Sequence, residues 1–228
     1  LRLRAGTGSG GFQAPTTLVS GWAGDRRHLT RADLNGDGRG DVLAARTDGV
    51  LEFSAGNGAG GVAAPVGIGA GWYDMLHVTS GADYTGDGKQ DVVGVSPGGV
   101  LVIYPGNGAG GLGGTPKTVG GGWHGFHFLV GGDFNNDGWG DLMAMSDNGT
   151  LYFYPRVSGG ASPPVVVGSG WLEFTAATGG ADYDGDGRAD LLVRTAAGEL
   201  FFYPGNGDGG FGARRLVNAD WADHLAIE

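Results

Sequence analysis

Short runs of hydrophobic and β-branched residues recur along the chain, separated by residues that favour turns. One complete set consists of MLHVTSG (75–81), DVVGV (91–95), VLVIY (100–104) and PKTVG (116–120), each bounded by Gly, Asn, Asp or Pro. Runs of this kind predict short β-strands. No stretch of about ten residues or more shows the 3.6-residue hydrophobic period of a helix. The pattern therefore predicts an all-β fold.

The four-strand pattern repeats along the chain. Its clearest marker is a nine-residue segment, DLNGDGRGD, DYTGDGKQD, DFNNDGWGD or DYDGDGRAD, whose successive spacings are 50, 50 and 49 residues. A repeat of about 40–50 residues with four strands is typical of a β-propeller blade. We expect one β-propeller domain over residues 1–228. Its complete repeat units are expected at about 23–72, 73–123, 124–171 and 172–221.

A fifth unit is split between the two ends of the sequence. LRLRA (1–5) aligns with LEFSA (51–55) on the third strand, and HLAIE (224–228) aligns with a first strand. Residues 1–22 and 222–228 would then share one blade, which would close the ring and remove its sheet edges. We therefore expect five four-stranded blades. Two alternatives stay open: an arc of a larger ring, and several copies that assemble to complete one.

Each nine-residue segment has the pattern of a calcium loop. Oxygen-bearing side chains occupy positions 1, 3, 5 and 9, a backbone carbonyl is available at position 7, and glycine at position 6 permits a sharp turn. Calcium takes six to eight oxygen ligands at about 2.3–2.6 Å. We expect about four Ca²⁺ ions, one per loop. The expected ligands are Asp33, Asn35, Asp37, Asp41 and the Arg39 carbonyl; Asp83, Thr85, Asp87, Asp91 and the Lys89 carbonyl; Asp133, Asn135, Asp137, Asp141 and the Trp139 carbonyl; and Asp182, Asp184, Asp186, Asp190 and the Arg188 carbonyl.

Two other interpretations of these segments are an EF-hand and a metal-free turn. An EF-hand loop begins in the same way, but it ends in Glu at position 12 and lies between helices. Here position 12 holds Ala44, Gly94, Ala144 or Val193. A metal-free turn is the simpler alternative, because Asp, Asn and Gly are common in turns generally. Four copies in register favour calcium.

The first segment also contains the adhesion tripeptide Arg-Gly-Asp at residues 39–41. An adhesion signal of this kind has to be an exposed and free tripeptide. The sister segments read KQD, WGD and RAD at the same positions, and Asp41 aligns with position 9 of the loop. We therefore interpret this tripeptide as part of the calcium loop.

The charge of the chain supports the same interpretation. The formal net charge is −10, and thirteen of the 24 acidic residues lie in the four loops, so four divalent cations would bring it to −10 + 8 = −2. An acidic protein is not expected to bind nucleic acid. The chain has no cysteine for a disulfide, and no apolar run approaches the roughly 20 residues of a membrane span. It begins at Leu1 without a signal peptide, which we interpret as a piece of a larger chain or assembly.

The loops with their following strand, as in GDGRADLLV (185–193), resemble FG-GAP or VCBS-type repeats. Such repeats form the propeller of integrin alpha subunits and occur in many secreted bacterial proteins. The resemblance implies a propeller with calcium between strands one and two of each blade, and a secreted or extracellular location. The Gly-Trp before strand one, as in GSGW (168–171), resembles VCBS modules attached to secreted hydrolases. It also resembles some propeller lectins, in which sugars bind between blades.

Tryptophan recurs just before the first strand of each unit, and two roles are open for it. Buried between blades, its large surface would hold them together. On a surface, its face would stack on a sugar ring, and repeated clefts would give multivalency. The candidate ligand-binding residues are Trp22, Trp72, Trp123, Trp171 and Trp221.

We expect no enzyme activity from this sequence and assign no catalytic residue. His124 and His127 form an H-x-x-H pair, but no third ligand for a transition metal accompanies them. We expect a secreted, non-catalytic, calcium-stabilised module that binds carbohydrate in the manner of a lectin, or an extracellular protein. The alternative is a structural or protein-interaction scaffold attached to a secreted enzyme or an assembly.

Overall fold

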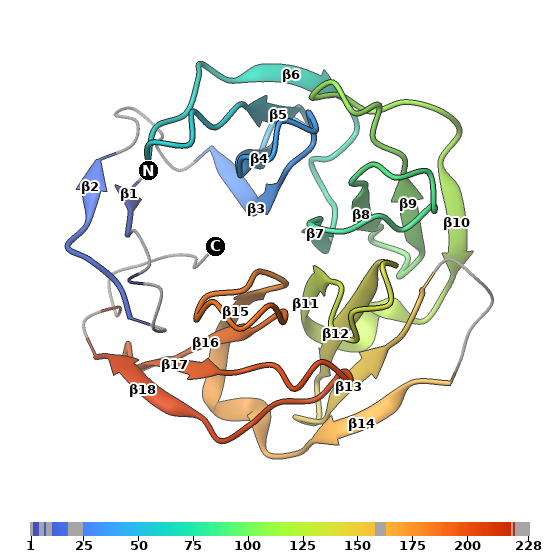
Figure 1. The fold of residues 1–228 in the computed structure, drawn as a ribbon. Coiled ribbons are helices and arrows are strands. Elements are labelled where there is room, and N and C mark those ends of the chain that lie inside the picture. Colours follow the sequence, from blue (N-terminus) through green and yellow to red (C-terminus); the bar gives the residue numbers. More distant parts are fainter. Residues whose placement is uncertain are drawn as a thin grey trace. The chain divides into compact units, whose positions relative to one another are not determined.

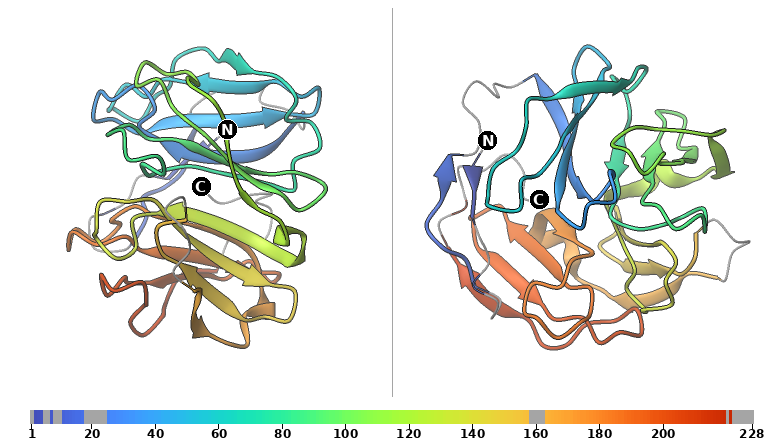
Figure 2. Two further views of the ribbon diagram at one scale, coloured as in Figure 1. Left: turned by 90° about the vertical axis from the view of Figure 1, so that its right-hand side faces the viewer. Right: turned by 45° about the horizontal axis from the view of Figure 1, so that its top comes forward.

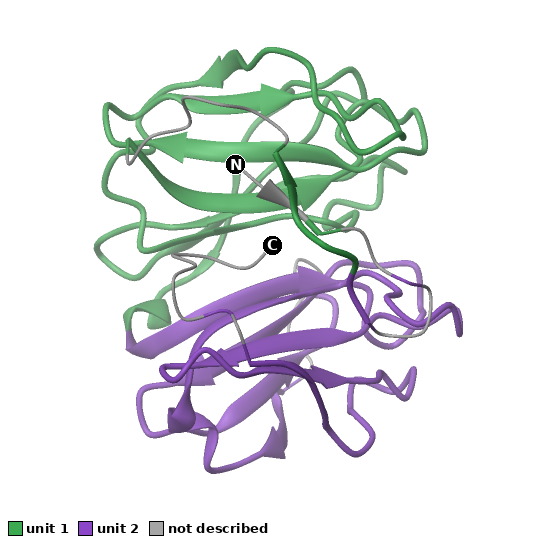
Figure 3. Ribbon diagram, turned by 90° about the vertical axis from the view of Figure 1, so that its left-hand side faces the viewer, with its two compact units in different colours: residues 1–5, 13–124 green, residues 6–12, 125–228 purple. Residues whose placement is uncertain are grey.

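The computed structural model describes residues 2–4, 7, 11–17, 25–157, 163–219 and 221. These residues form eighteen short β-strands and two 3₁₀-helices (Figure 1). Among them, no helix has the length and apolar character needed to cross a membrane. The chain divides into two compact units (Figure 3). Unit 1 comprises residues 1–5 and 13–124, and unit 2 comprises residues 6–12 and 125–228.

Unit 1 contains two four-stranded antiparallel sheets and one two-stranded sheet. Blade 1 has the strand order β3 (Arg26–Ala32), β4 (Asp41–Arg46), β5 (Leu51–Ser54) and β6 (Val66–Gly69). Blade 2 consists of β7 (His77–Thr79), β8 (Val92–Val95), β9 (Leu101–Tyr104) and β10 (Lys117–Gly120). The first strands of the two blades, β3 and β7, lie beside each other. The two-stranded sheet pairs β1 (Arg2–Leu3) with β2 (Thr16–Thr17).

Unit 2 contains two further four-stranded antiparallel sheets. Blade 3 consists of β11 (Phe126–Gly132), β12 (Asp141–Ser146), β13 (Leu151–Tyr154) and β14 (Val165–Gly168). Blade 4 consists of β15 (Phe174–Gly179), β16 (Leu191–Thr195), β17 (Leu200–Tyr203) and β18 (Arg215–Asn218). Their first strands, β11 and β15, again lie beside each other. The 3₁₀-helices η1 (Trp123–Gly125) and η2 (Trp171–Glu173) precede β11 and β15.

Each blade is a meander in which consecutive strands pair, as Figure 2 shows from two further sides. In blade 2 the four strands agree with the predicted runs to within two residues at each end. The prediction of five four-stranded blades is wrong, because the described residues form four four-stranded sheets. The fifth unit contributes only β1 and β2 among the described residues, and a blade also needs a first and a second strand. The predicted first strand, residues 222–228, lies outside the described residues.

The burial of each strand follows its place in the blade. The second strands are buried along almost their whole length, as in β8, where all four residues are buried. The third strands of blades 2 to 4 alternate between buried and partly exposed residues, as in LYFY of β13, because successive side chains point to opposite faces. The fourth strands are the most exposed, as in β14, whose Val165 and Val166 are 54% and 60% exposed. Within each unit, buried side chains of the two blades therefore form a shared hydrophobic core.

A tryptophan joins the end of one blade to the next blade within each unit. The backbone N–H of Trp171 donates to Gly149 O at 3.0 Å, and Gly149 has a φ of 79°, which favours glycine in this hairpin. The Trp171 ring lies 5.3 Å from the ring of Phe174 and 4.9 Å from that of Tyr203 in blade 4. Trp72 has the same arrangement in unit 1, with a bond to Gly49 O and its ring 4.6 Å from that of Tyr104.

Replacing Trp171 with alanine should therefore destabilise unit 2 strongly. The indole is 7% exposed and belongs to the core cluster between blades 3 and 4, and truncation of a buried Trp costs about 3–5 kcal/mol. The neighbouring Leu172 is 63% exposed, so Leu172→Ala should change the unfolding free energy by no more than about 0.5 kcal/mol. Urea unfolding followed by circular dichroism measures both. Equal effects of the two changes would contradict the role assigned to Trp171.

Candidate functional site

Four similar loops connect the first to the second strand in blades 1 to 4, and all four lie within the described residues. The aspartate at position 1 closes each loop on itself. Asp33 accepts hydrogen bonds from the N–H groups of Asp37 at 3.0 Å and Gly38 at 2.9 Å. Asp83 accepts from Gly86 at 2.6 Å and Gly88 at 2.7 Å. Loops 3 and 4 repeat these bonds through Asp133 and Asp182.

The aspartate at position 5 fixes the turn that follows it. Its Oδ1 accepts the N–H of the position-7 residue at 2.9–3.0 Å in every loop. In loops 1, 2 and 4 the position-7 side chain is a cation that pairs with the same aspartate, as in Lys89–Asp87 at 3.3 Å and Arg188–Asp186 at 3.4 Å. The position-7 residue is therefore held by its backbone, and its side chain lies on the outside of the loop.

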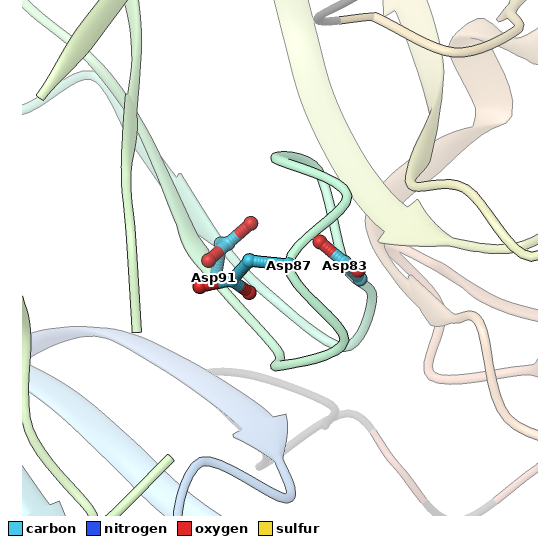
Figure 4. Close-up of side chains that lie close together, drawn as sticks. All are labelled: Asp83, Asp87 and Asp91. Atoms are coloured by element: carbon cyan, nitrogen blue, oxygen red, sulfur yellow. The ribbon is translucent and has the colours of Figure 1, made fainter. Parts of the chain in front are cut away.

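Carboxylate oxygens converge in two of the four loops. Asp83, Asp87 and Asp91 can each place one oxygen within 4.8 Å of the others (Figure 4), and so can Asp182, Asp184 and Asp190. The position-3 oxygens of these loops, Thr85 Oγ1 and Asp184 Oδ1, are buried and lack a hydrogen-bond partner. Unsatisfied buried oxygens beside clustered carboxylates fit a hard cation such as calcium, which takes only oxygen ligands.

Loops 1 and 3 have an asparagine at position 3. Asn35 Nδ2 donates to Asp37 Oδ2 at 3.4 Å, and Asn135 Nδ2 donates to Asp137 Oδ2 at 3.1 Å. These amide donors reduce part of the repulsion between the carboxylates of the loop. In their absence a bound cation would have to offset that repulsion alone. The predicted ligands of each calcium site therefore lie on a single loop. Among the described residues, three acidic oxygens converge in loops 2 and 4.

The aspartate at position 9 has a structural role that the sequence reasoning missed. Asp91 is 0% exposed, and its Oδ2 accepts the N–H groups of Tyr84 and Thr85 at 2.8 Å each. Its Oδ1 accepts the N–H of Gly106 at 2.9 Å, fifteen residues further along the chain. The same carboxylate thus joins the loop to the turn between the third and fourth strands.

This connection recurs in all four blades. The equivalent aspartates are 0% exposed, and each accepts one N–H from loop position 2 and one from the residue fifteen positions later, at 2.7–3.0 Å. A carboxylate has about four lone-pair sites, so these bonds leave room for a cation. The constant separation between the position-9 aspartate and the glycine-rich turn was the signal in the sequence that could have revealed the bond.

The pKa values of these buried carboxyl groups are raised. Burial raises the pKa of Asp41, Asp91 and Asp190, against the opposing effect of their backbone hydrogen bonds. In Asp141 burial raises the pKa to about 6. In contrast, the pKa of the exposed Asp182 is lowered: burial acts to raise it, but bonds from Gly187, Gly185 and other N–H groups outweigh this. The position-9 carboxylate therefore carries an energetic cost when ionised, which a neighbouring cation would reduce.

The Arg-Gly-Asp tripeptide lies inside the first loop. Asp41 is 0% exposed, and its two oxygens accept N–H groups of Leu34 and Gly56 at 3.0 and 2.9 Å. Its carboxylate is therefore unavailable to an adhesion receptor. The tripeptide is part of the loop framework, as the alignment with the sister loops predicted.

The tryptophans proposed as ligand-binding residues are buried where the structure describes them. Trp72, Trp123, Trp171 and Trp221 are 3%, 7%, 7% and 8% exposed, and Trp22 lies outside the described residues. In each of the four, the backbone N–H donates to a hairpin glycine at 3.0 Å. The rings of Trp72, Trp171 and Trp221 lie against neighbouring aromatic rings, which fits a packing role.

Blade 3 differs from the other blades at two positions whose side chains contact each other, and this contact was not predicted from the sequence. Trp139 replaces the cation at position 7, and Arg156 replaces the turn glycine found in the other three blades. The Arg156 guanidinium lies 3.7 Å from the centre of the Trp139 ring. Arg156 adopts a φ of 46° and still donates its N–H to Asp141 Oδ1 at 2.7 Å. The buried bond is thus retained although the turn sequence has changed.

Among the described residues, no histidine belongs to a group of three or more potential metal ligands. His28 Nε2 lies 2.8 Å from Met75 O and donates to it. Burial is the main cause that lowers the pKa of His28, so the neutral ring is favoured. This histidine connects the first strand of blade 1 to the segment before β7, which is a structural role.

The position-9 role can be separated from metal binding in calcium-free buffer. Asp91→Ala should remove the acceptor of three N–H groups, two of them in buried bonds and one in a partly buried bond, and lower the unfolding free energy by about 3 kcal/mol or more. Asp87→Ala in the same loop removes one exposed acceptor and an exposed ion pair, and should cost less than about 1 kcal/mol. Urea unfolding in a chelator compares the two. A similar cost for both variants would contradict the role of Asp91.

Comparisons with known proteins agree with this architecture. The family profile described as FG-GAP-like repeat matches residues 83–144 and 133–193. No curated protein sequence matched the chain. Among solved structures, a lectin of Agrocybe aegerita described as recognising non-reducing terminal N-acetylglucosamine is 26% identical, with a TM-score of 0.55. The match covers 92% of this chain and 58% of that lectin.

A second similar structure is the BP39L lectin from Burkholderia pseudomallei. It is 16% identical with a TM-score of 0.55, and the match covers 91% of this chain and 60% of that protein. The chain therefore spans about three fifths of the length of either lectin. Both likenesses identify the fold as an all-β propeller. With its FG-GAP-like repeats and four-stranded blades, the chain is an FG-GAP propeller repeat protein.

Proposed function

We propose that the chain is a non-catalytic carbohydrate-binding module whose loops are stabilised by calcium. The observation that carries the proposal is the likeness to the Agrocybe aegerita lectin, at 26% identity over 92% of the chain. A second propeller with the same TM-score is also a lectin. A module of this kind acts outside the cell, where its glycans are displayed and calcium is abundant. The whole protein to which it belongs would use it to attach to those glycans.

Calcium would be held by the loops through the residues predicted from the sequence. In loop 2 these are Asp83, Thr85, Asp87, Asp91 and the Lys89 carbonyl, and equivalent residues would serve the other loops. Support comes from the converging carboxylates and from the unsatisfied oxygens of Thr85 and Asp184. A cation that binds only the folded state stabilises it by about 2.7 kcal/mol at 100 times its dissociation constant. Its role here is structural.

A second candidate function is that of a scaffold for an attached enzyme or an assembly. The burial of the four described tryptophans favours it, because a buried indole presents no stacking face to a sugar. In the carbohydrate-binding proposal the ligand therefore contacts other residues. The two candidates differ in one observable property, which is the binding of glycans.

Calcium addition should raise the melting temperature of the calcium-free protein by at least about 5 °C, and a chelator should reverse the change. In loop 4, Asp186→Ala should remove one of about four bound ions, because the carboxylate is an expected ligand. Arg188→Ala is the matched control, since only its carbonyl is an expected ligand. Calorimetric titration counts the ions. An unchanged melting temperature with chelator would sink the calcium proposal.

A printed glycan array should show binding in calcium-containing buffer. We expect signals from glycans ending in N-acetylglucosamine, and competition by the free sugar, because the similar lectin is described as recognising that terminus. The heat-unfolded protein is the control for non-specific adhesion. If the folded protein binds no glycan on the array, the carbohydrate proposal fails and the scaffold takes its place.

A further inference from the structure

Arg215 of blade 4 lies beside an expected calcium ligand, although it belongs to none of the loops. It is the first residue of β18, where it pairs with Phe202 of β17. Its guanidinium lies 4.3 Å from the centre of the Phe202 ring. Its Nη2 lies 3.7 Å from Oδ2 of Asp184, which is position 3 of loop 4. The strand and the ring therefore hold a positive charge next to the loop.

Loop 4 has one more carboxylate than any other loop. Its position 3 is an aspartate, whereas the other loops have an asparagine or a threonine there. Asp184 is also one of the three aspartates whose oxygens converge in this loop, and like charges at such short separations repel each other. Within the loop, Arg188 pairs with Asp186 at 3.4 Å. The additional carboxylate at position 3 is paired with Arg215 instead.

The strand position of Arg215 varies with the charge of the loop in the other blades. By its pairing with the third strand, its counterparts are Val66, Lys117 and Val165 in blades 1, 2 and 3. Valine is found in the blades whose loops have an asparagine at position 3 and donate its NH₂ group to an aspartate. A cation is found in blades 2 and 4, whose loops bring three carboxylates together. This pattern indicates that the position serves charge balance.

Arg215 occupies only one oxygen of Asp184. The ion pair uses Oδ2, while Oδ1 is buried and has no hydrogen-bond partner. The side chains of Arg215 and Asp184 are 48% and 20% exposed, so water and salt screen the pair and it adds little to the stability of the fold. Oδ1 thus stays available to a cation, which would share this carboxylate with the guanidinium.

We propose that Arg215 is an internal counter-ion of loop 4 that lowers the affinity of this loop for calcium. The proposal rests on the calcium-binding role proposed above. In the calcium-free protein the guanidinium already offsets part of the repulsion among the carboxylates, so an incoming ion has less repulsion to relieve. In the bound state the ion and the guanidinium are two positive charges on one carboxylate, and they repel each other. Both effects act in the same direction.

Arg215→Gln tests the proposal, because it removes the charge and keeps a long polar side chain. The calcium affinity of loop 4 should rise about two- to fivefold at low ionic strength, which is the effect expected of a partly exposed charge pair. The gain should largely disappear in 1 M salt, where the screening length is about 3 Å. Arg215→Lys keeps the charge, and its affinity should stay within about twofold of that of the unchanged protein.

Arg214→Gln is the matched control for the loss of one positive charge. The Arg214 guanidinium pairs with Glu173 at 2.6 Å and lies 4.4 Å from the centre of the Phe201 ring, and neither partner belongs to loop 4. This variant has the same net charge as Arg215→Gln, and the substituted residue is adjacent in the chain. The calcium affinity of loop 4 should therefore remain nearly unchanged in it.

Backbone ¹H–¹⁵N signals measure the loops separately during a calcium titration. The signal of Gly187 reports on loop 4 and that of Gly88 on loop 2, whose affinity should be the same in every variant. Equal affinities of loop 4 in Arg215→Gln and Arg214→Gln, or a gain that persists in 1 M salt or appears in Arg215→Lys, would overturn the role of Arg215 while calcium binding stands. A Gly187 signal that calcium does not shift in the unchanged protein would overturn calcium binding at loop 4 itself.

Discussion

The buried carboxylate at position 9 of each loop is the interaction on which the blades depend. Each one is 0% exposed and accepts N–H groups from its own loop and from a turn fifteen residues later. Without it, at least two buried or partly buried N–H groups per blade would lack an acceptor, and each such loss costs up to about 1–3 kcal/mol. One side chain therefore fixes the loop, the second strand and the outer turn. The candidate calcium sites are built on that framework.

Because this framework is held through backbone groups, the other loop positions can vary. Blade 3 keeps the N–H bond to Asp141 although Arg156 replaces a glycine and Trp139 replaces a cation. Position 4 is glycine in loops 1, 2 and 4 but Asn136 in loop 3, where its Nδ2 donates to Gly187 O of the next loop. Functional variation in this repeat is thus expected on the surfaces of loops whose backbone is the same.

The sequence predicted the strands and loops well because both have local signals. The strand runs of blade 2 and the four nine-residue loops were found from hydrophobic pattern and spacing alone. The number of blades was predicted wrongly. The incomplete unit at residues 1–22 supplies only a third and a fourth strand, and counting it as a full blade assumed that a first and a second strand pair with them. The burial of Trp72 and Trp171 and the double use of Asp91 depend on contacts between distant segments, which no local pattern specifies.

Electrostatics connects the buried carboxylates to the proposed calcium sites. Burial raises the pKa of the position-9 aspartates, to about 6 in Asp141, so the loops without a cation hold an ionised group in an unfavourable environment. N–H bonds offset part of that cost, and a divalent ion would offset more of it.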